Sequence, residues 1–188
     1  MDFKTVIQEH QRVVEQLIQQ SIPSIEAIAK KCSDTLKNGN MIFLCGNGGS
    51  AADCQHIAAE LVGRFVTERR SLPAIALTTD TSNLTAISND YGYEQVFSRQ
   101  VEALVREGDV VIGISTSGNS KNVVRAFETA KAKGAILIGM TGEKDGEIAK
   151  QADICLKVPS AVTARIQECH IMVGHMICAY IDEVIGLE

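Results

Sequence analysis

The first 40 residues carry apolar side chains at the spacing of an α-helix. Apolar positions recur every three or four residues over 3–18 and again over 25–36, so each set would cover one face of a helix. Pro23 interrupts the pattern, and Asn38-Gly39 is a helix stop signal. We therefore predict a pair of helices within residues 1–38 that serves packing or oligomer formation.

Five short apolar runs follow, and helical patterns alternate with them. The runs cover 41–46, 74–79, 110–116, 136–142 and 154–159, and the helical patterns cover 50–65, 93–108, 120–134 and 143–153. Alternation of this kind, with nearly continuous apolar strands, is typical of a doubly wound parallel sheet. We predict an α/β fold with a five-stranded parallel sheet flanked by helices over 41–188, forming a single domain, 1–188, with the N-terminal helical pair. Substrate should bind beyond the carboxyl ends of the strands, at the loops GNGGS, TTDTSN and STSGNS.

The last segment, residues 161–184, reads as a long helix that is apolar on much of its circumference. Its apolar positions are Ile166, Cys169, Ile171, Met172, Val173, Met176, Ile177, Ala179, Ile181 and Val184. A helix that is apolar on several faces is buried on several faces. In a chain of this size, we expect a subunit interface to be the reason.

Composition and charge narrow the range of partners. The chain has 188 residues, a net charge of −5 and no tryptophan, so it offers no basic face for nucleic acid or for an anionic membrane. Its N-terminus lacks the features of a signal peptide, and its apolar runs are shorter than a membrane span. The six cysteines contain no CxxC pair. We expect buried thiols and a cytoplasmic protein.

The first strand ends in a glycine-rich turn. Gly46, Gly48 and Ala51 satisfy G-x-G-x-x-A between a strand and a helix, which is the context of a dinucleotide fingerprint. The acidic residue that holds a ribose about 20 residues later has no counterpart there, because the next strand ends only at Asp80. Dinucleotide binding and a tight turn without a ligand both remain alternatives.

The third strand leads into a loop rich in hydroxyls. Residues 115–120 read STSGNS and precede a helix that begins near Lys121. Hydroxyl groups beside the free N–H groups of a helix N-terminus suit a dianionic phosphate monoester. N-capping with a polar turn is the alternative, although one or two hydroxyls would suffice for it. The loop lacks the Lys-Ser/Thr ending of a P-loop, which disfavours nucleoside triphosphate hydrolysis.

A histidine and a glutamate share one face of the helix after the glycine turn. His56 and Glu60 are four residues apart and so lie one turn apart. Taken alone, this spacing is usual for a surface pair. A second candidate set lies on the final helix and comprises Arg165, Gln167, Glu168, His170 and His175. Helical phase favours Glu168 as the same-face partner of His175, since Gln167 is offset from His175 by about 80°.

Four stretches of the chain together resemble a known family. They are CGNGGSAADCQHIAAEL, LTAISNDYGYEQVFSRQVEAL, GDVVIGISTSGNSKNVV and ARIQECHIMVGHMI, and they are similar to the phosphoheptose (sedoheptulose 7-phosphate) isomerases of the sugar-isomerase (SIS) domain superfamily. The resemblance covers essentially the whole chain in order. It implies a SIS fold and a homotetramer with active sites at subunit interfaces, which would fit the apolar final helix.

The resemblance also implies a site, carried over residue by residue. The implied zinc ligands are His56, Glu60, Gln167 and His175. The implied catalytic pair is Glu60 and His175. The implied substrate contacts are Asn47, Gly48, Gly49, Ser50, Glu60, Asn89, Asp90, Ser115, Thr116, Ser117, Ser120 and Gln167. The resemblance thus selects Gln167, whereas helical phase favours Glu168.

The implied reaction converts sedoheptulose 7-phosphate to D-glycero-D-manno-heptose 7-phosphate, the first step of ADP-heptose biosynthesis. Ser50 and the loop 115–120 would anchor the phosphate and so orient the carbonyl end. Glu60 would remove the C1 proton to give a cis-enediol, His175 would protonate the oxygen side, and bound zinc would polarise the oxygens. The division of proton transfers between Glu60 and His175 stays open, because a metal lowers the basicity of its ligand.

Two other functions occur on the same fold. One is an adaptor that binds the replication initiator protein, and the other is a sugar-phosphate-sensing module. An adaptor has no need for His56, Glu60 and His175 together, and no basic helix-turn-helix of a sensing module is evident in the sequence. One position departs from part of the family, because Ala164 stands where some members carry an acidic residue before the arginine of RIQE. Asp90 is a candidate to replace that acid.

Overall fold

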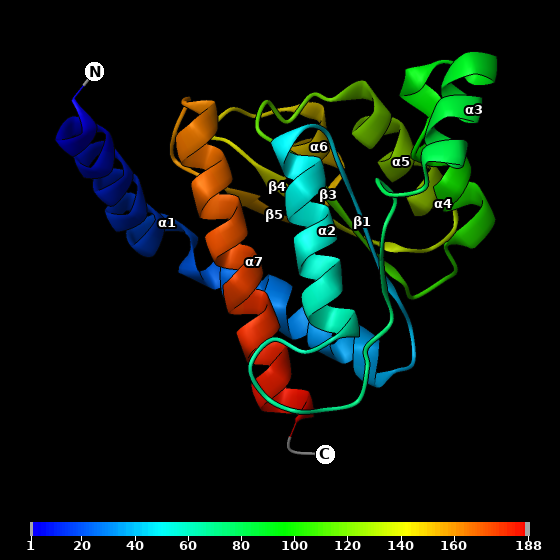
Figure 1. Cartoon of the computed structure of the whole chain (residues 1–188), viewed down its shortest axis with the longest axis horizontal. Helices are drawn as coiled ribbons and strands as arrows, with labels where there is room; N and C mark the ends of the chain where they lie inside the picture. Colours follow the sequence, from blue (N-terminus) through cyan, green and yellow to red (C-terminus); the bar gives the residue numbers. More distant parts are fainter. Residues whose placement is uncertain (1, 187–188) are drawn as a thin grey trace.

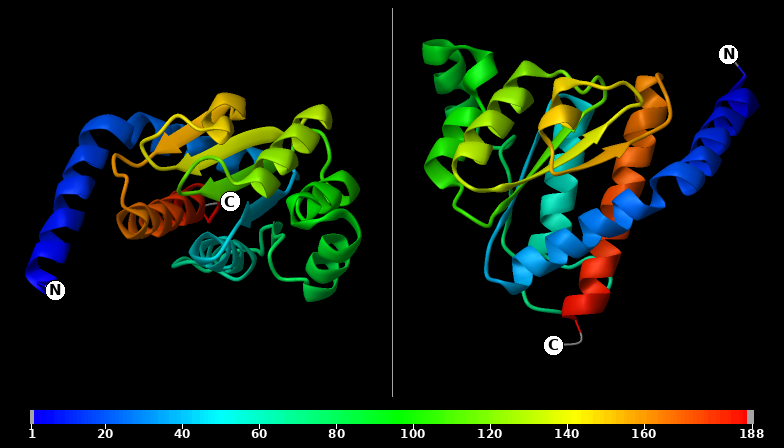
Figure 2. Two further views of the ribbon diagram at one scale, coloured as in Figure 1. Left: turned by 90° about the horizontal axis from the view of Figure 1, so that it is seen from above. Right: turned by 180° about the vertical axis from the view of Figure 1, so that it is seen from behind.

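The structure, a computed structural model, describes residues 2–186, so residue 1 and residues 187–188 of the predicted ranges lie outside it. The first element is one helix, α1 (Phe3–Lys37), where the sequence predicts two. Pro23 lies inside this helix, and the two halves of α1 meet at a bend (Figures 1 and 2). The prediction of two separate helices is therefore wrong. Proline removes one helical hydrogen bond and kinks the backbone, but here the chain resumes the same helix.

The predicted end of this helical segment is confirmed. Asn38 is the C-cap of α1, and Gly39 follows with φ of +79°. This left-handed conformation costs glycine little and other residues more, and it turns the chain out of the helix. Strand β1 begins three residues later.

The sheet has the predicted five strands, all parallel. They are β1 (Ile42–Gly46), β2 (Ala74–Ala76), β3 (Val110–Ser115), β4 (Ile136–Thr141) and β5 (Ile154–Lys157). Their order across the sheet is β2-β1-β3-β4-β5. All positions of β1 and β3 are buried, as expected for central parallel strands covered on both faces.

Helices cover both faces of the sheet (Figure 2). The remaining elements are α2 (Gly49–Val62), α3 (Thr81–Tyr91), the 3-10 turn η1 (Tyr93–Gln95), α4 (Ser98–Leu104), α5 (Lys121–Ala132), α6 (Glu147–Gln151) and α7 (Thr163–Ile185). Helices α1, α2 and α7 share a core with one face of the sheet, and α3 to α6 share a second core with the other face. Successive strand residues point to opposite faces, so Leu44 enters the first core and Phe43 the second.

Helix α3 is the element that the apolar pattern did not predict. Its residues Thr81–Tyr91 contain no fully buried side chain, so an amphipathic stripe is nearly absent. Asp80 caps its N-terminus by accepting a hydrogen bond from the Asn83 amide at 2.9 Å. The loop predicted at TTDTSN therefore contains a helix start, which the capping aspartate could have indicated.

The final helix, α7, is buried mostly by its own chain. It packs between α1 and α2 (Figure 1), and Ile166, Cys169, Val173, Ile177 and Ile181 are all buried there. Of its large apolar residues, Met176 and Tyr180 are exposed. The breadth of the apolar surface on α7 is thus explained largely within one subunit, and the argument from that breadth to a subunit interface is weakened.

All six cysteines are free thiols, and five of them are fully buried. Burial raises the pKa of Cys32 and Cys45 to about 12, which keeps these thiols protonated and inert. Within residues 2–186, no helix combines the length and the apolar composition that crossing a membrane requires.

Candidate functional site

The candidate site lies where the strand order reverses. The chain leaves β1 toward β2 on one side and later returns to β3 on the other side of β1, which defines the switch point of a doubly wound sheet. The glycine loop (residues 46–50) follows β1, and the serine loop (residues 115–120) follows β3. Because β1 and β3 are parallel neighbours, both loops leave the same edge of the sheet.

The glycine loop passes close to the start of α7. Gly48 has φ of +57°, which favours glycine, and Gly49 opens α2. A Cβ on Gly49 would lie only 2.6 Å from Nε2 of Gln167. The absence of a side chain at Gly49 therefore lets the Gln167 amide reach the N-terminal turn of α2. The following residue, Ser50, is buried.

The serine loop gathers three hydroxyls in one turn. Ser115 Oγ lies 2.8 Å from Ser120 Oγ and 3.4 Å from Ser117 Oγ. The Asn119 amide donates to Ser117 Oγ at 3.2 Å, and helix α5 begins directly after Ser120. A hollow of about 280 Å³ opens beside Thr116 and Ser117. Clustered hydroxyls at a helix N-terminus form the type of setting that holds an anion.

Helices α2 and α7 bring a histidine–glutamate face together. His56 Nε2 lies 3.0 Å from His175 Nε2 and 3.2 Å from Glu60 Oε1, and the two imidazole rings are 5.0 Å apart. About half of the His56 side chain and a quarter of the Glu60 side chain are exposed. Residues separated by 119 positions in the chain thus form one polar cluster that a ligand can reach.

Gln167 and Glu168 point in different directions. Gln167 lies against Gly49 at the glycine loop. Glu168 accepts hydrogen bonds from Arg165 Nε at 2.7 Å and lies 2.8 Å from His10 Nδ1 of α1. Glu168 is thus engaged in joining α7 to α1, whereas Gln167 lies at the glycine loop. His170, also on α7, is fully buried with Nε2 3.1 Å from the Thr141 carbonyl.

Two further residues border the face, and the sequence reading missed them. Phe65 stacks on the His175 ring at 5.5 Å between centroids. It lies in the loop after α2, which ends at Val62, whereas the helical pattern predicted over 50–65 included it. Asp53 lies one turn before His56 on α2. Its Oδ2 is buried and has no hydrogen-bond partner within the described residues. Burial raises the pKa of the Asp53 carboxyl, and the nearby His56 and His175 partly counteract that rise.

A buried ion pair ties the two helices of this face together. Arg69 Nε lies 2.6 Å from Asp182 Oδ1 of α7, and both side chains are almost fully buried. Arg69 also donates to the carbonyls of Glu60 and Leu61 at the end of α2, at 2.9 and 3.0 Å. Asp182 further accepts from the amides of Val66 and Thr67. These bonds fix the end of α2 to α7 and satisfy the charges that burial would otherwise penalise.

The donors of this face suit a zinc ion in type. Two imidazoles and a carboxylate are common zinc ligands, and a tetrahedral ion with bonds of about 2.1 Å separates its donors by roughly 3.4 Å. The observed spacings of 3.0 and 3.2 Å are close to that value. As the side chains stand, no group of three or more His, Cys, Asp or Glu residues in 2–186 is arranged to hold a metal.

Asn89 and Asp90 lie at the end of α3, where they are exposed. The Asn89 amide donates to Asp90 Oδ1 at 2.9 Å. The next turn approaches the glycine loop, because the Tyr93 hydroxyl donates to Asn47 Oδ1 at 3.1 Å. This segment therefore lies beside the loop. Within residues 2–186, Asn89 and Asp90 have no hydrogen bond or ion pair with the predicted site residues other than each other.

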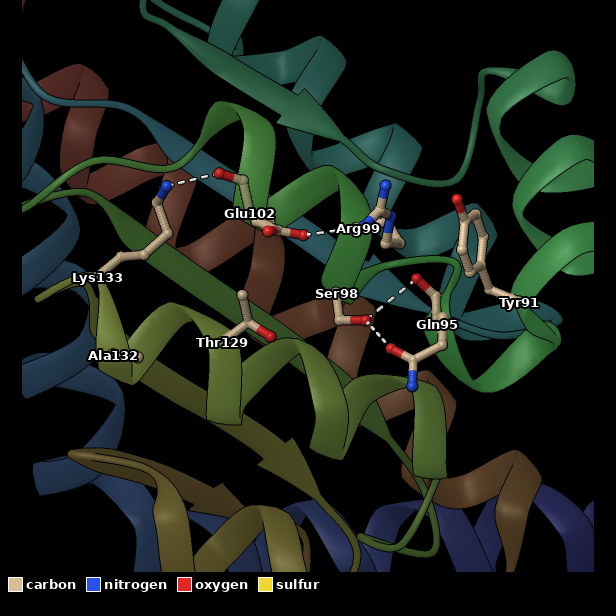
Figure 3. A pocket seen from close by; sticks show the side chains of 8 residues that line it. All are labelled: Tyr91, Gln95, Ser98, Arg99, Glu102, Thr129, Ala132 and Lys133. Atoms are coloured by element: carbon tan, nitrogen blue, oxygen red, sulfur yellow. Dashed lines mark hydrogen bonds and ion pairs between the residues drawn. The ribbon is translucent and has the colours of Figure 1, made fainter.

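The largest hollow among the described pockets lies elsewhere, between α4 and α5 (Figure 3). It is lined by Tyr91, Gln95, Ser98, Arg99, Glu102, Thr129, Ala132 and Lys133. Its charged groups engage one another: Arg99 sits 4.7 Å over the Tyr91 ring and 3.4 Å from Glu102, and Lys133 donates to the Glu102 carbonyl. These groups are bonded within the wall of the hollow, and the predicted site residues are not among them.

Comparisons with known proteins agree with this architecture. The sequence profile of the SIS domain family matches residues 6–142. A phosphoheptose isomerase of Nitratiruptor is 58% identical over 175 residues, which covers 93% of this chain and 94% of that protein. Solved structures of phosphoheptose isomerases from Neisseria gonorrhoeae and Francisella tularensis superpose with TM-scores of 0.91 and 0.93. They are 45% and 37% identical, and each comparison covers 96% of both chains.

Proposed function

Since the chain belongs to the phosphoheptose isomerase family of SIS-domain proteins, we propose that it is an aldose–ketose isomerase that converts sedoheptulose 7-phosphate to D-glycero-D-manno-heptose 7-phosphate. The observation that carries the proposal is the contact of His56 with both Glu60 and His175 beside the glycine loop. Proton transfer between adjacent carbons needs a base and an acid within reach of one substrate, and this face offers both.

The proton transfers are assigned to Glu60 and His175. Glu60 takes a proton from C1 of the ketose, and the C2 oxygen is protonated from the histidine side, which gives a cis-enediol. Return of a proton to C2 and loss of the C1 hydroxyl proton then yield the aldehyde at C1. No atom is gained or lost, so the reaction needs no oxidant or reductant. Phe65 holds the His175 ring from one side by stacking, which restricts the directions in which the imidazole can move.

Zinc is proposed as the cofactor, one ion per subunit. His56, Glu60 and His175 would hold it, with the amide oxygen of Gln167 as a less usual fourth ligand. The ion would stabilise negative charge on the enediolate oxygens. Incubation with a chelator should remove zinc, measured by mass spectrometry, and abolish turnover. His56→Ala should bind less zinc than the parent protein, while His10→Ala, at the junction of α1 with α7, should keep its zinc.

The phosphate is assigned to the other end of the site. Ser115, Ser117 and Ser120 present their hydroxyls together, and we assign Thr116 of the same loop and Ser50 of the glycine loop to the phosphate as well. We further assign Asn47, Gly48, Gly49, Gln167, Asn89 and Asp90 to the middle of the substrate. Fixing the phosphate orients the carbonyl end toward Glu60 and lowers the entropic cost of reaction.

We propose that the protein forms a homotetramer, because exposed apolar side chains occur on one helical layer. Exposed large apolar residues on α1, α2, α7 and the loop after α2 are Phe3, Ile7, Ile18, Val62, Val66, Met176 and Tyr180. Such residues on one helical layer favour an interface between copies. Light scattering should give four subunits for the parent protein. Ile7→Asp with Ile18→Asp should give a smaller species, whereas Leu104→Asp on the opposite layer should not.

The alternative functions are not favoured. Neither an adaptor for the replication initiator protein nor a sugar-phosphate sensor would need the side chains of the histidine–glutamate face. We place the enzyme in the cytoplasm, where sugar phosphates are made, at the first step of ADP-heptose biosynthesis, and we assign it no nucleic-acid or membrane partner. The test is incubation of purified protein with sedoheptulose 7-phosphate, with and without chelator, followed by NMR. Absence of aldose at any zinc loading, together with tight binding of the initiator protein, would overturn the proposal.

A further inference from the structure

A buried asparagine on α5 is bonded to the glycine loop. Asn122 is the second residue of α5, and only 4% of it is exposed. Its Oδ1 accepts from Asn47 Nδ2 at 2.9 Å, and its Nδ2 donates to Asn47 Oδ1 at 2.8 Å. The two side-chain amides therefore form a closed pair with two hydrogen bonds, in which each is both donor and acceptor.

Two more contacts fix the orientation of this amide pair. The Val123 amide donates to Asn122 Oδ1 at 3.0 Å, and the Tyr93 hydroxyl donates to Asn47 Oδ1 at 3.1 Å. The Val123 N–H can only donate, so a flipped Asn122 amide would place N–H against N–H. The closed pair then fixes the Asn47 amide, and the Tyr93 hydroxyl donates to the oxygen that this orientation presents. Each partner thus confirms the assignment of oxygen and nitrogen in the other.

The pair leaves one hydrogen-bond group of Asn47 for a ligand. A side-chain amide has two N–H donors, and the closed pair uses the one on the same side as the carbonyl oxygen. The second N–H of Asn47 points away from Asn122. Asn47 is only partly buried, so this N–H is open to a ligand held between the glycine loop and the serine loop.

The pair also joins the two loops of the site. Asn47 belongs to the glycine loop, and Asn122 lies two residues after Ser120 of the serine loop. Buried hydrogen bonds in a low-dielectric setting are costly to leave unmade, so the two loops are held at a fixed separation. We propose that Asn122 is a positioning residue of the isomerase, which orients the Asn47 amide toward the sugar phosphate and fixes the glycine loop relative to the serine loop.

This inference rests on the proposed isomerase function, and its test is a double-mutant cycle on kcat/KM. Asn47→Ala and Asn122→Ala should each lower kcat/KM by about 10-fold to 100-fold, the range for loss of one or two buried hydrogen bonds. Because Asn122 acts through Asn47, adding Asn122→Ala to Asn47→Ala should cost little more. Independent, multiplicative losses in the double variant would overturn the proposal.

Milder variants separate positioning from folding. Asn122→Asp keeps both acceptor contacts but replaces the donor to Asn47 Oδ1 with a carboxylate oxygen that repels it, and Tyr93→Phe loses only the hydroxyl bond to Asn47. Each should lower kcat/KM in the parent but not in the Asn47→Ala background. An equal effect of either variant in both backgrounds would contradict the proposal, even where Asn122→Ala fails to fold.

A buried amide outside the site gives the matched control. Gln100 on α4 is 7% exposed and donates to the carbonyls of Leu77 and Val96 at 3.0 and 2.8 Å. Gln100→Ala should lower the unfolding temperature as Asn122→Ala does, but leave kcat and KM unchanged. Equal kinetic losses in both would show that Asn122 acts only through stability. If the parent protein isomerises no heptose phosphate, the proposed function fails, and the same cycle on calorimetric binding of sedoheptulose 7-phosphate still tests the positioning role.

Discussion

The two ends of the candidate site are built in different ways. The serine loop draws its hydroxyls from six consecutive residues, which are held by bonds within that turn. The histidine–glutamate face draws on two helices, and His56 and His175 are 119 residues apart in the chain. The loop is therefore a local structure, while the face exists only because α2 packs against α7. A mutation that disturbs the packing of α2 on α7 should therefore change the histidine–glutamate face and leave the serine loop intact.

The largest expected effect is at the face itself. Glu60→Gln should lower kcat by about 10²-fold to 10⁴-fold, because an amide cannot accept the C1 proton. KM should change little, since the phosphate end is intact. Steady-state kinetics with zinc content measured in parallel separate loss of the base from loss of a ligand. Glu128→Gln, an exposed helical glutamate paired with Arg125, is the control, and full activity of Glu60→Gln would remove this residue from the mechanism.

The next effect tests the dependence of the face on helix packing. Asp182→Ala leaves Arg69 buried without its partner, and loss of one member of a buried pair costs about 3–5 kcal/mol of unfolding free energy. Denaturant unfolding measures this loss. Under conditions where the variant is still folded, kcat should fall more than KM rises, since the end of α2 loses its anchor to α7. Asp34→Ala, which breaks an exposed pair with Lys30, should change stability by less than about 1 kcal/mol. An equal rise of KM and fall of kcat in Asp182→Ala would argue against two separable ends.

A smaller effect is expected at the serine loop. Ser117→Ala with Ser120→Ala removes two of the three clustered hydroxyls and should raise KM by about 10-fold to 100-fold. The zinc content and the unfolding temperature should stay close to those of the parent. Ser82→Ala on α3 serves as the control for a serine outside the loop. If the double variant lost zinc, the two ends would not be independent.

The smallest effect concerns His170, the buried histidine of α7. Burial lowers the pKa of His170 to about 4, against an unfolded value of 6.5. Below pH 6.5 this histidine is protonated in the unfolded chain but stays neutral in the folded chain. The free energy of unfolding therefore falls as the pH drops from 6.5 toward 4. At pH 5.5 the loss is about 1 kcal/mol. His170→Gln should remove this component, and an unchanged slope of stability between pH 7 and 5 would contradict the assignment.

Much of the fold was predictable because each element carries its own signal. The five strands are short apolar runs, and α2, α5 and α7 show clear helical spacing with glycine or hydroxyl residues at their ends. Pro23 led to the wrong prediction of two helices. A proline weakens a helix, but the sequence does not show whether packing keeps the helix continuous across it. Helix α3 escaped notice because it buries almost no apolar surface.

The site was predictable in its loops and less so in its helices. The glycine turn at Gly48 and the hydroxyl-rich serine loop could be predicted from residue type alone. The choice between Gln167 and Glu168 could not be made from helical phase, since it depended on His10 and Arg165 reaching Glu168. Phe65, Asp53 and Asn122 gave no signal that separated them from ordinary loop and helix residues.

The sequence by itself determined the alternation of strands and helices, the run of hydroxyl residues in the serine loop and the net negative charge. These are properties of neighbouring residues or of the composition, and both can be evaluated without knowledge of the tertiary structure. The tertiary structure alone decided which side chains of α7 face α2, which face α1, and that Asn122 bonds Asn47. Those outcomes depend on how two helices or two loops pack, and the free energy of packing belongs to pairs of distant residues rather than to any one segment.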